Sequence, residues 1–69
     1  MHIKTGNRIN KAFSLINSAS SLLIEAAIEN DPTSIDVGFK SAEQNLLKAI
    51  DLIKEARIIE QNVTNTPQS

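Results

Sequence analysis

The pattern of apolar residues is the feature of this chain that most restricts its fold. Large apolar residues and alanines alternate at spacings of three and four, and the same pattern occurs twice. Such spacings place each set along one side of an α-helix, as in a heptad repeat with a large residue at one core position and alanine at the other. The sequence therefore predicts two amphipathic helices. The two sets are Ile9, Ala12, Ile16, Ala19, Leu23 and Ala26, and Phe39, Ala42, Leu46, Ala49, Ile53 and Ala56.

The two sets also match each other if the chain reverses direction near Pro32. When facing residues have numbers that add to 65, every alanine of one helix lies opposite a large residue of the other, so that Ala12, for example, faces Ile53. Alternating large and small side chains fill the space between two helices densely and without strain. We therefore expect an antiparallel helical hairpin in this register.

The predicted turn contains Asp31 followed by Pro32. Proline cannot continue the first helix, and it disfavours the helical conformation in the residue before it. An aspartate followed by a proline is also a suitable N-cap and first-turn pair for the next helix. We expect a single domain of residues 1–62, with helices at about 7–29 and 34–62, a turn at 30–34, and a flexible polar tail at 63–69.

The hairpin needs a further source of stability. A chain of 69 residues buries little apolar surface, and two helices alone cannot enclose a core. The absence of cysteine excludes disulfides and thiolate metal sites. We therefore expect an all-α protein in which two hairpins dimerise into a four-helix bundle.

A partner interface is predicted from residues beside the main apolar stripe. Between Lys11 and Glu25 the first helix has no charged residue, although a solvated helix usually carries lysine and glutamate. Both helices also have more large apolar residues than one hairpin can cover. We predict an interface with a second copy or with another protein. Its residues are Phe13, Leu15, Ser18, Leu22, Ile24, Ile28, Ile50, Leu52 and Ile59.

Residues that carry chemistry are scarce. The chain has no glycine-rich phosphate loop, its single histidine is His2, and it lacks the paired histidines of a metal site in a helical bundle. We therefore expect no enzymatic activity, no catalytic residues, no cofactor and no metal.

Charge and hydropathy bound the partners and the location. The formal net charge of −1 favours neither nucleic acid nor an anionic membrane. No apolar run is long enough to cross a bilayer, and charged and polar residues occupy the place of the apolar segment of a signal peptide. The expected location is the cytoplasm.

Two classes of function fit these observations. The first is a protein–protein interaction module, such as an oligomeric adaptor or a small assembly or secretion chaperone. In size, hairpin plan and the proline-containing turn at Asp31 and Pro32, the chain resembles the small helical proteins of bacterial type III secretion. That resemblance, which covers needle subunits and their co-chaperones, implies a subunit that packs hairpin to hairpin or a small secretion chaperone.

The alternative is an RNA-binding bundle. The chain resembles the plasmid repressor-of-primer family in length, hairpin plan, alternating small and large core layers, and polar tail. The resemblance implies that paired RNA loops bind the polar faces of the first helices. Here the basic residues of that face lie at one end and no aromatic residue is on it, so we expect a protein partner rather than RNA. The corresponding residues are Lys4, Arg8, Asn10, Lys11, Ser14, Asn17 and Ser21.

Overall fold

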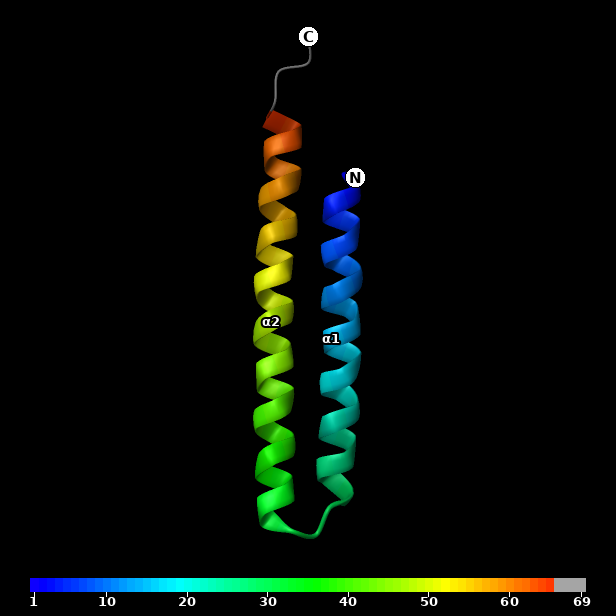
Figure 1. Ribbon diagram of the computed structural model, residues 1–69, viewed down its shortest axis with the longest axis vertical. Helices are drawn as coiled ribbons and strands as arrows, with labels where there is room; N and C mark the ends of the chain where they lie inside the picture. The colour runs from blue at the N-terminus through cyan, green and yellow to red at the C-terminus, as the bar shows by residue number, and fades with distance from the viewer. Residues whose placement is uncertain (66–69) are drawn as a thin grey trace.

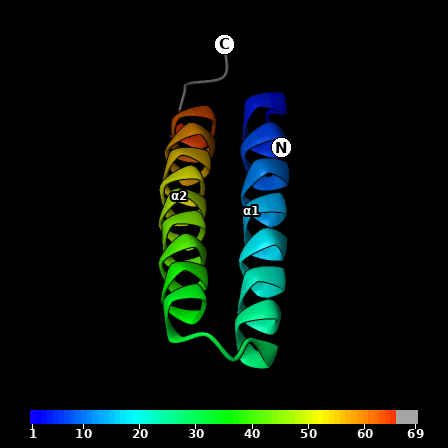
Figure 2. The same ribbon diagram turned by 60° about the horizontal axis from the view of Figure 1, so that its bottom comes forward.

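The chain forms two long helices connected by a tight turn. The computed structural model describes residues 1–65, and the side chains of residues 1–63. Helix α1 spans Ile3–Ile28 and helix α2 spans Pro32–Asn65. The helices run antiparallel and lie side by side in both views (Figures 1 and 2). The predicted all-α helical hairpin is confirmed.

The helices extend further than the sequence predicted. Helix α1 begins at Ile3 rather than near residue 7, because His2 caps it: the Nδ1 atom of His2 accepts a hydrogen bond of 3.0 Å from the backbone N–H of Lys4. Helix α2 begins at Pro32 rather than residue 34 and continues to Asn65. The expected flexible tail at 63–69 therefore starts within a helix, and its residues 66–69 lie outside the described residues.

The turn has the chemistry that the sequence indicates. Glu29 leaves the helical conformation, with φ −83° and ψ 144°, and ends α1. The carbonyl of Asp31 accepts the first hydrogen bond of α2 from the N–H of Ile35, at 3.0 Å. The Asp31 carboxylate also accepts a 3.0 Å hydrogen bond from the Ser34 hydroxyl. Asp31 thus directly precedes α2 and Pro32 lies in the first turn of the helix, as predicted, although the helix starts two residues earlier than expected.

Small residues at every seventh position form the contact between the helices. The six alanines at these positions have exposed fractions of only 1–6 %. Thr5, seven residues before Ala12, is 2 % exposed and continues the series toward the N-terminus of α1. The backbones come close here: a Cβ atom added to Gly38 would lie 3.2 Å from the Cβ of Ala26 and 3.7 Å from the carbonyl oxygen of Leu22. We call these residues the alanine row. Its members are Thr5, Ala12, Ala19, Ala26, Ala42, Ala49 and Ala56.

The register is within one residue of the predicted one, but the large residues are not enclosed. Thr5 contacts Glu60, and their numbers add to 65; Gly38 lies against Ala26, and these add to 64. The large residues of the repeat were expected to cover the alanines. Instead they lie beside the alanine row with exposed fractions of 38–47 %, because the close approach of the two backbones leaves no space for them between the helices. They are Ile9, Ile16, Leu23, Phe39, Leu46 and Ile53.

The hairpin is a thin rod without an enclosed core. Its extents are 61 × 13 × 11 Å and its radius of gyration is 16.4 Å. A compact domain of the same length would have a radius of gyration of about 11 Å. Among the described residues, only the small side chains of the alanine row are fully buried. The hairpin therefore buries very little of its own apolar surface.

Candidate interaction surface

The alanine row divides the hairpin into two sides. On a helix, the residues three and four positions after a given residue lie on opposite sides of it. In an antiparallel pair, equivalent positions of the two helices share a side. Ile9 and Ile53, each four positions after a row member, accordingly line one shallow depression together with Ala56. Leu15 and Leu52, each three positions after a row member, line another.

The side with the four-after positions carries most of the exposed large apolar residues that flank the alanine row. They form two rows, which are the six large residues of the heptad repeat, and the row on α2 ends at Glu60, four positions after Ala56. Phe13 and Ile50 follow Ile9 and Leu46 by one helical turn and widen this surface, with exposed fractions of 63 % and 46 %. We call this surface the apolar face. Its members are Ile9, Phe13, Ile16, Leu23, Phe39, Leu46, Ile50 and Ile53.

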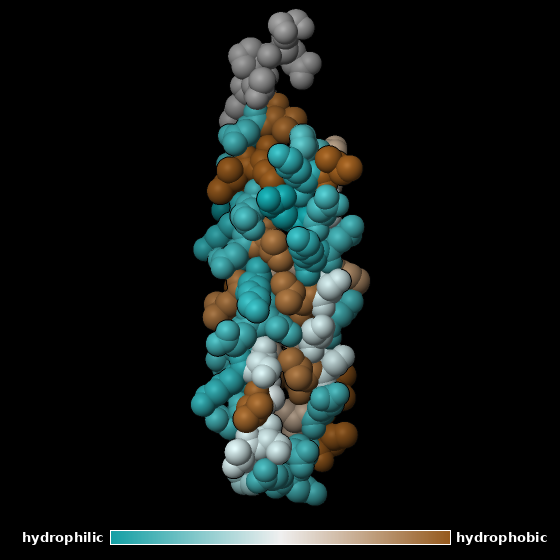
Figure 3. All heavy atoms as spheres, in the orientation of Figure 1, coloured by the Kyte–Doolittle hydropathy of each residue, from teal (hydrophilic) through white to brown (hydrophobic). Residues whose placement is uncertain are grey.

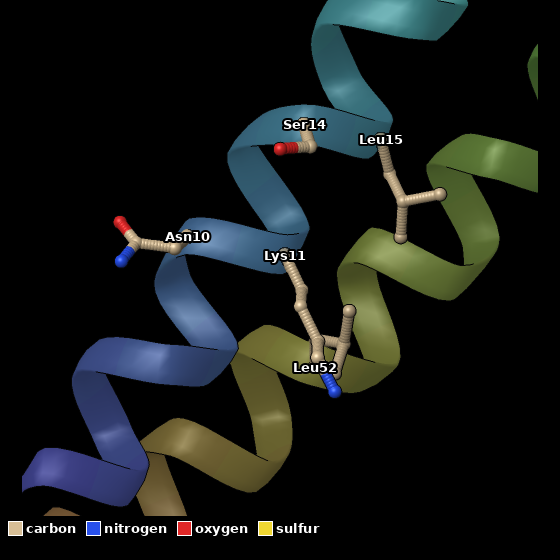
Figure 4. Close-up of a pocket in the computed structure, with 5 residues that line it drawn as sticks. All are labelled: Asn10, Lys11, Ser14, Leu15 and Leu52. Atoms are coloured by element: carbon tan, nitrogen blue, oxygen red, sulfur yellow. The ribbon is translucent and has the colours of Figure 1, made fainter.

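The opposite side is closed more tightly and is more polar. Leu15, Leu22, Leu52 and Ile59 are half-buried there, and Asn45 interrupts them. Figure 3 looks onto this side, where hydrophilic and intermediate residues surround separate hydrophobic patches. Figure 4 shows its main depression, in which Leu15 points from α1 toward α2, whereas Asn10 and Ser14 point away from α2. The depression is lined by Asn10, Lys11, Ser14, Leu15 and Leu52.

Polar contacts bind the helices together at the end that is distant from the turn. The Glu60 carboxylate accepts hydrogen bonds from the hydroxyl of Thr5, at 2.8 Å, and from the backbone N–H of His2, at 3.0 Å. Both bonds favour the charged carboxylate and therefore lower the pKa of Glu60 below its usual value. The bond from the backbone of His2 has the larger effect and the bond from Thr5 the smaller one. Glu60 follows Ile53 by seven residues on α2, so this polar contact lies at the end of the apolar face and leaves the face itself exposed.

Arg8 belongs to the same end but to the more polar side. Its Nη1 donates a 3.1 Å hydrogen bond to the carbonyl of Lys4, and its Nε lies 4.0 Å from Oε1 of Glu55. The second distance allows an ion pair but is too long for a hydrogen bond. The arginine of the face that resembles an RNA-binding surface is therefore already held by groups of its own chain.

The residues predicted as a partner interface do not form one surface. Phe13 and Ile50 lie on the apolar face, with Ile24 exposed further round α1, away from α2. Ile28 is exposed at the end of α1, and Ser18 is exposed on the more polar side. The remaining four are half-buried against the other helix on that side, namely Leu15, Leu22, Leu52 and Ile59. Whether any of the nine contacts a partner stays a prediction.

Sequence reasoning missed six of the eight residues of the apolar face, because it placed the large residues of the repeat inside the hairpin. One signal could have located them. Small residues recur at every seventh position in both helices, and such a series lets two backbones approach so closely that only the small residues fit between them. The large residues must then lie to one side.

Other features of the described residues add no assignment. Within residues 1–65, neither helix combines the length and the apolar composition needed to cross a bilayer. No three acidic or histidine side chains of that range are grouped so that they could hold a metal ion. Comparison of the chain with known protein families, with curated proteins and with solved structures finds no match.

Proposed function

We propose that this protein is a non-enzymatic protein–protein interaction module whose first partner is a second copy of itself. Two hairpins bring their apolar faces together and form a four-helix bundle. The observation that supports this proposal is the apolar face, in which eight large apolar side chains lie together with exposed fractions of 38–63 %. Exposed apolar patches of this kind are typical of interfaces.

The area of the apolar face supports a partner of the same size. If a large apolar side chain presents roughly 150–200 Å², the exposed fractions amount to about 500–700 Å² of apolar surface on each hairpin. A stable interface buries about 800 Å² on each partner, including a polar rim. The polar residues along both edges can supply the remainder, so a second hairpin is sufficient to cover the face.

The energetics of the hairpin point the same way. Ordering each residue costs about 1–2 kcal/mol of backbone conformational entropy. Within the described residues, the fully buried side chains are six alanines and one threonine, which offer little apolar area to offset that cost. Covering the apolar face would bury the side chains that contribute most. Folding and association are therefore expected to be coupled.

The test is the mass of the protein in solution, measured by sedimentation equilibrium at micromolar concentration. We expect a dimer. Leu46→Glu places a charge in the apolar face and should abolish the dimer, whereas Gln44→Glu changes an exposed residue away from that face and should leave the dimer intact. A folded wild-type monomer, or equal effects of the two variants, would contradict the proposal.

The dimer is proposed to act as an adaptor or an assembly chaperone in the cytoplasm. Ile24 and Leu47, exposed by 66 % and 61 %, lie beyond the edge of the apolar face and remain available to a further protein. The proposed location is supported by the absence of cysteine, which is typical of proteins in a reducing compartment. The RNA-binding alternative is tested by electrophoretic mobility shift at low salt, where we expect no shift of structured RNA.

A further inference from the structure

We propose that the two hairpins of the dimer are opposed, with the turn of one beside the chain ends of the other. The inference rests on the proposed dimerisation through the apolar face. Two hairpins can cover that face in two ways, with their turns at the same end or at opposite ends. Neighbouring helices are antiparallel in both arrangements, so helix dipoles do not distinguish them. The distribution of charged side chains does.

The hairpin is electrically polarised along its length. The half that contains the turn, residues 17–47, has five acidic residues and one basic residue, a net charge of −4. The half that contains the chain ends has six basic and three acidic residues, a net charge of +3, and together the two halves give the formal charge of −1. The charges of the acidic half are Glu25, Glu29, Asp31, Asp36 and Glu43 with Lys40; those of the basic half are Lys4, Arg8, Lys11, Lys48, Lys54 and Arg57 with Asp51, Glu55 and Glu60.

This polarity favours opposed hairpins. Turns at the same end would place the acidic half beside the acidic half and the basic half beside the basic half. Opposed hairpins place each acidic half beside a basic half. Neighbouring helices in a bundle are 8–10 Å apart, which is comparable to the Debye length of about 8 Å at physiological salt, so these charges still interact.

Residues on the edge of the apolar face define where the twofold axis lies. On α2, Glu43 and Arg57 lie seven residues before and after Ile50 and therefore share its edge. An axis that passes beside Ile50 brings Glu43 of each copy to Arg57 of the other, and Ile50 to its own copy. This position is close to the middle of both helices, so the two hairpins overlap over nearly their full length.

The same twofold axis is also compatible with contacts between the two α1 helices. With facing numbers that add to 64 or 65, Ile50 lies level with residues 14–15 of α1. Antiparallel α1 helices centred there place Phe13 near Ile16 of the other copy, and Ser20 near Ile9. The corresponding edge of α1 carries no charge between Gly6 and Ala27, so two such edges can meet without repulsion.

The first test is the distance between the two turns. The chain has no cysteine, so a spin label at Thr33→Cys, an exposed site beside the turn, is unique in each copy. Opposed hairpins should give a distance above about 40 Å, because α1 alone spans that length. Turns at the same end should give less than about 25 Å. A dimer with the short distance would overturn the opposed arrangement alone, whereas a monomer would overturn the proposed function as well.

The second test exchanges the charges of the edge pair. Glu43→Lys and Arg57→Glu should each weaken the dimer by about 3- to 10-fold, and the double variant should recover the wild-type dissociation constant. Asp51→Lys makes the same change of charge at an exposed site away from that edge and should have a smaller effect. Failure of the double variant to recover the affinity would exclude the Glu43–Arg57 contact and the axis beside Ile50.

Discussion

The two sides of the alanine row differ in a way that composition does not reveal. Both carry leucine and isoleucine along their length. On one side Leu15 and Leu52 are half-buried against the neighbouring helix, and polar residues such as Asn45 interrupt the series. On the other, the large residues remain 38–47 % exposed with no polar residue among them. When alanines make the contact, the position of a residue relative to that contact decides its burial, and the large residues on one side stay exposed in the single hairpin.

The sharpest way to break this comparison is to truncate one residue on each side. Ile16→Ala should reduce the free energy of unfolding by about 2–4 kcal/mol, although Ile16 is 38 % exposed in the single hairpin, because the proposed dimer would enclose it. Leu15→Ala removes a half-buried side chain that faces solvent in the dimer and should cost about 1 kcal/mol. Chemical denaturation at one fixed protein concentration measures both.

The order of these two losses is the informative result. If Leu15→Ala costs as much as Ile16→Ala or more, the apolar face is exposed in the functional molecule and the comparison fails. The loss for Ile16→Ala should also depend on protein concentration, because unfolding of a dimer does.

Enlarging the alanine row tests the contact itself. Ala19→Leu and Ala49→Leu each add a large side chain where the exposed fraction is 1 %, and each should destabilise the hairpin by about 1–3 kcal/mol through overpacking. Ser21→Leu adds similar volume at an exposed site and should change stability by less than about 0.5 kcal/mol. Unchanged melting temperatures for both alanine variants would exclude the facing alanine rows.

The sequence predicted the features that depend on local chemistry. Helical periodicity gave two helices, the pair Asp31 and Pro32 gave the turn, and the spacing of alanines gave a register within one residue of the observed one. It did not give the rotation of each helix about its own axis. The pattern places the centre of the contact between Ala19 and Ile16, whereas the structure centres it on Ala19. That shift depends on how closely the backbones approach, which is a property of the pair of helices and not of either one.

The start of α1 was missed for a different reason. Thr5 has the side chain of a good N-cap, yet it is buried and donates its hydroxyl hydrogen bond to Glu60. His2, one helical turn earlier, provides the cap instead. The hydroxyl of Thr5 is thus used in a contact with a residue far away in the sequence, and helical periodicity alone carries no information about such a contact.

Substitutions at the two glycines test how closely the helices approach, and we expect smaller changes in stability from them than from the alanine variants. Nothing lies within 4 Å of a Cβ atom added to Gly6, so Gly6→Ala should stabilise α1 by about 0.5–1 kcal/mol through reduced backbone entropy. At Gly38 the added Cβ would be 3.2 Å from the Cβ of Ala26, and the helices would have to move apart by a few tenths of an ångström. Gly38→Ala should therefore stabilise clearly less than Gly6→Ala. Equal gains in thermal unfolding would show that the close approach does not constrain the helices.

The smallest expected effect concerns the polar contact at the end of the apolar face. Because hydrogen bonds from His2 and Thr5 lower the pKa of Glu60 in the folded state, the folded protein binds a proton there less readily than the unfolded chain. The contribution of Glu60 to stability is therefore complete above its usual pKa of about 4.5 and is lost as the pH falls through the lower folded-state value. Glu60→Gln should accordingly be less stable than the wild type at pH 7, and the difference should shrink steadily below pH 4.5. A difference that stays constant between pH 7 and pH 3 would mean that the carboxylate charge does not contribute to this contact, and that the two helix ends are held by packing alone.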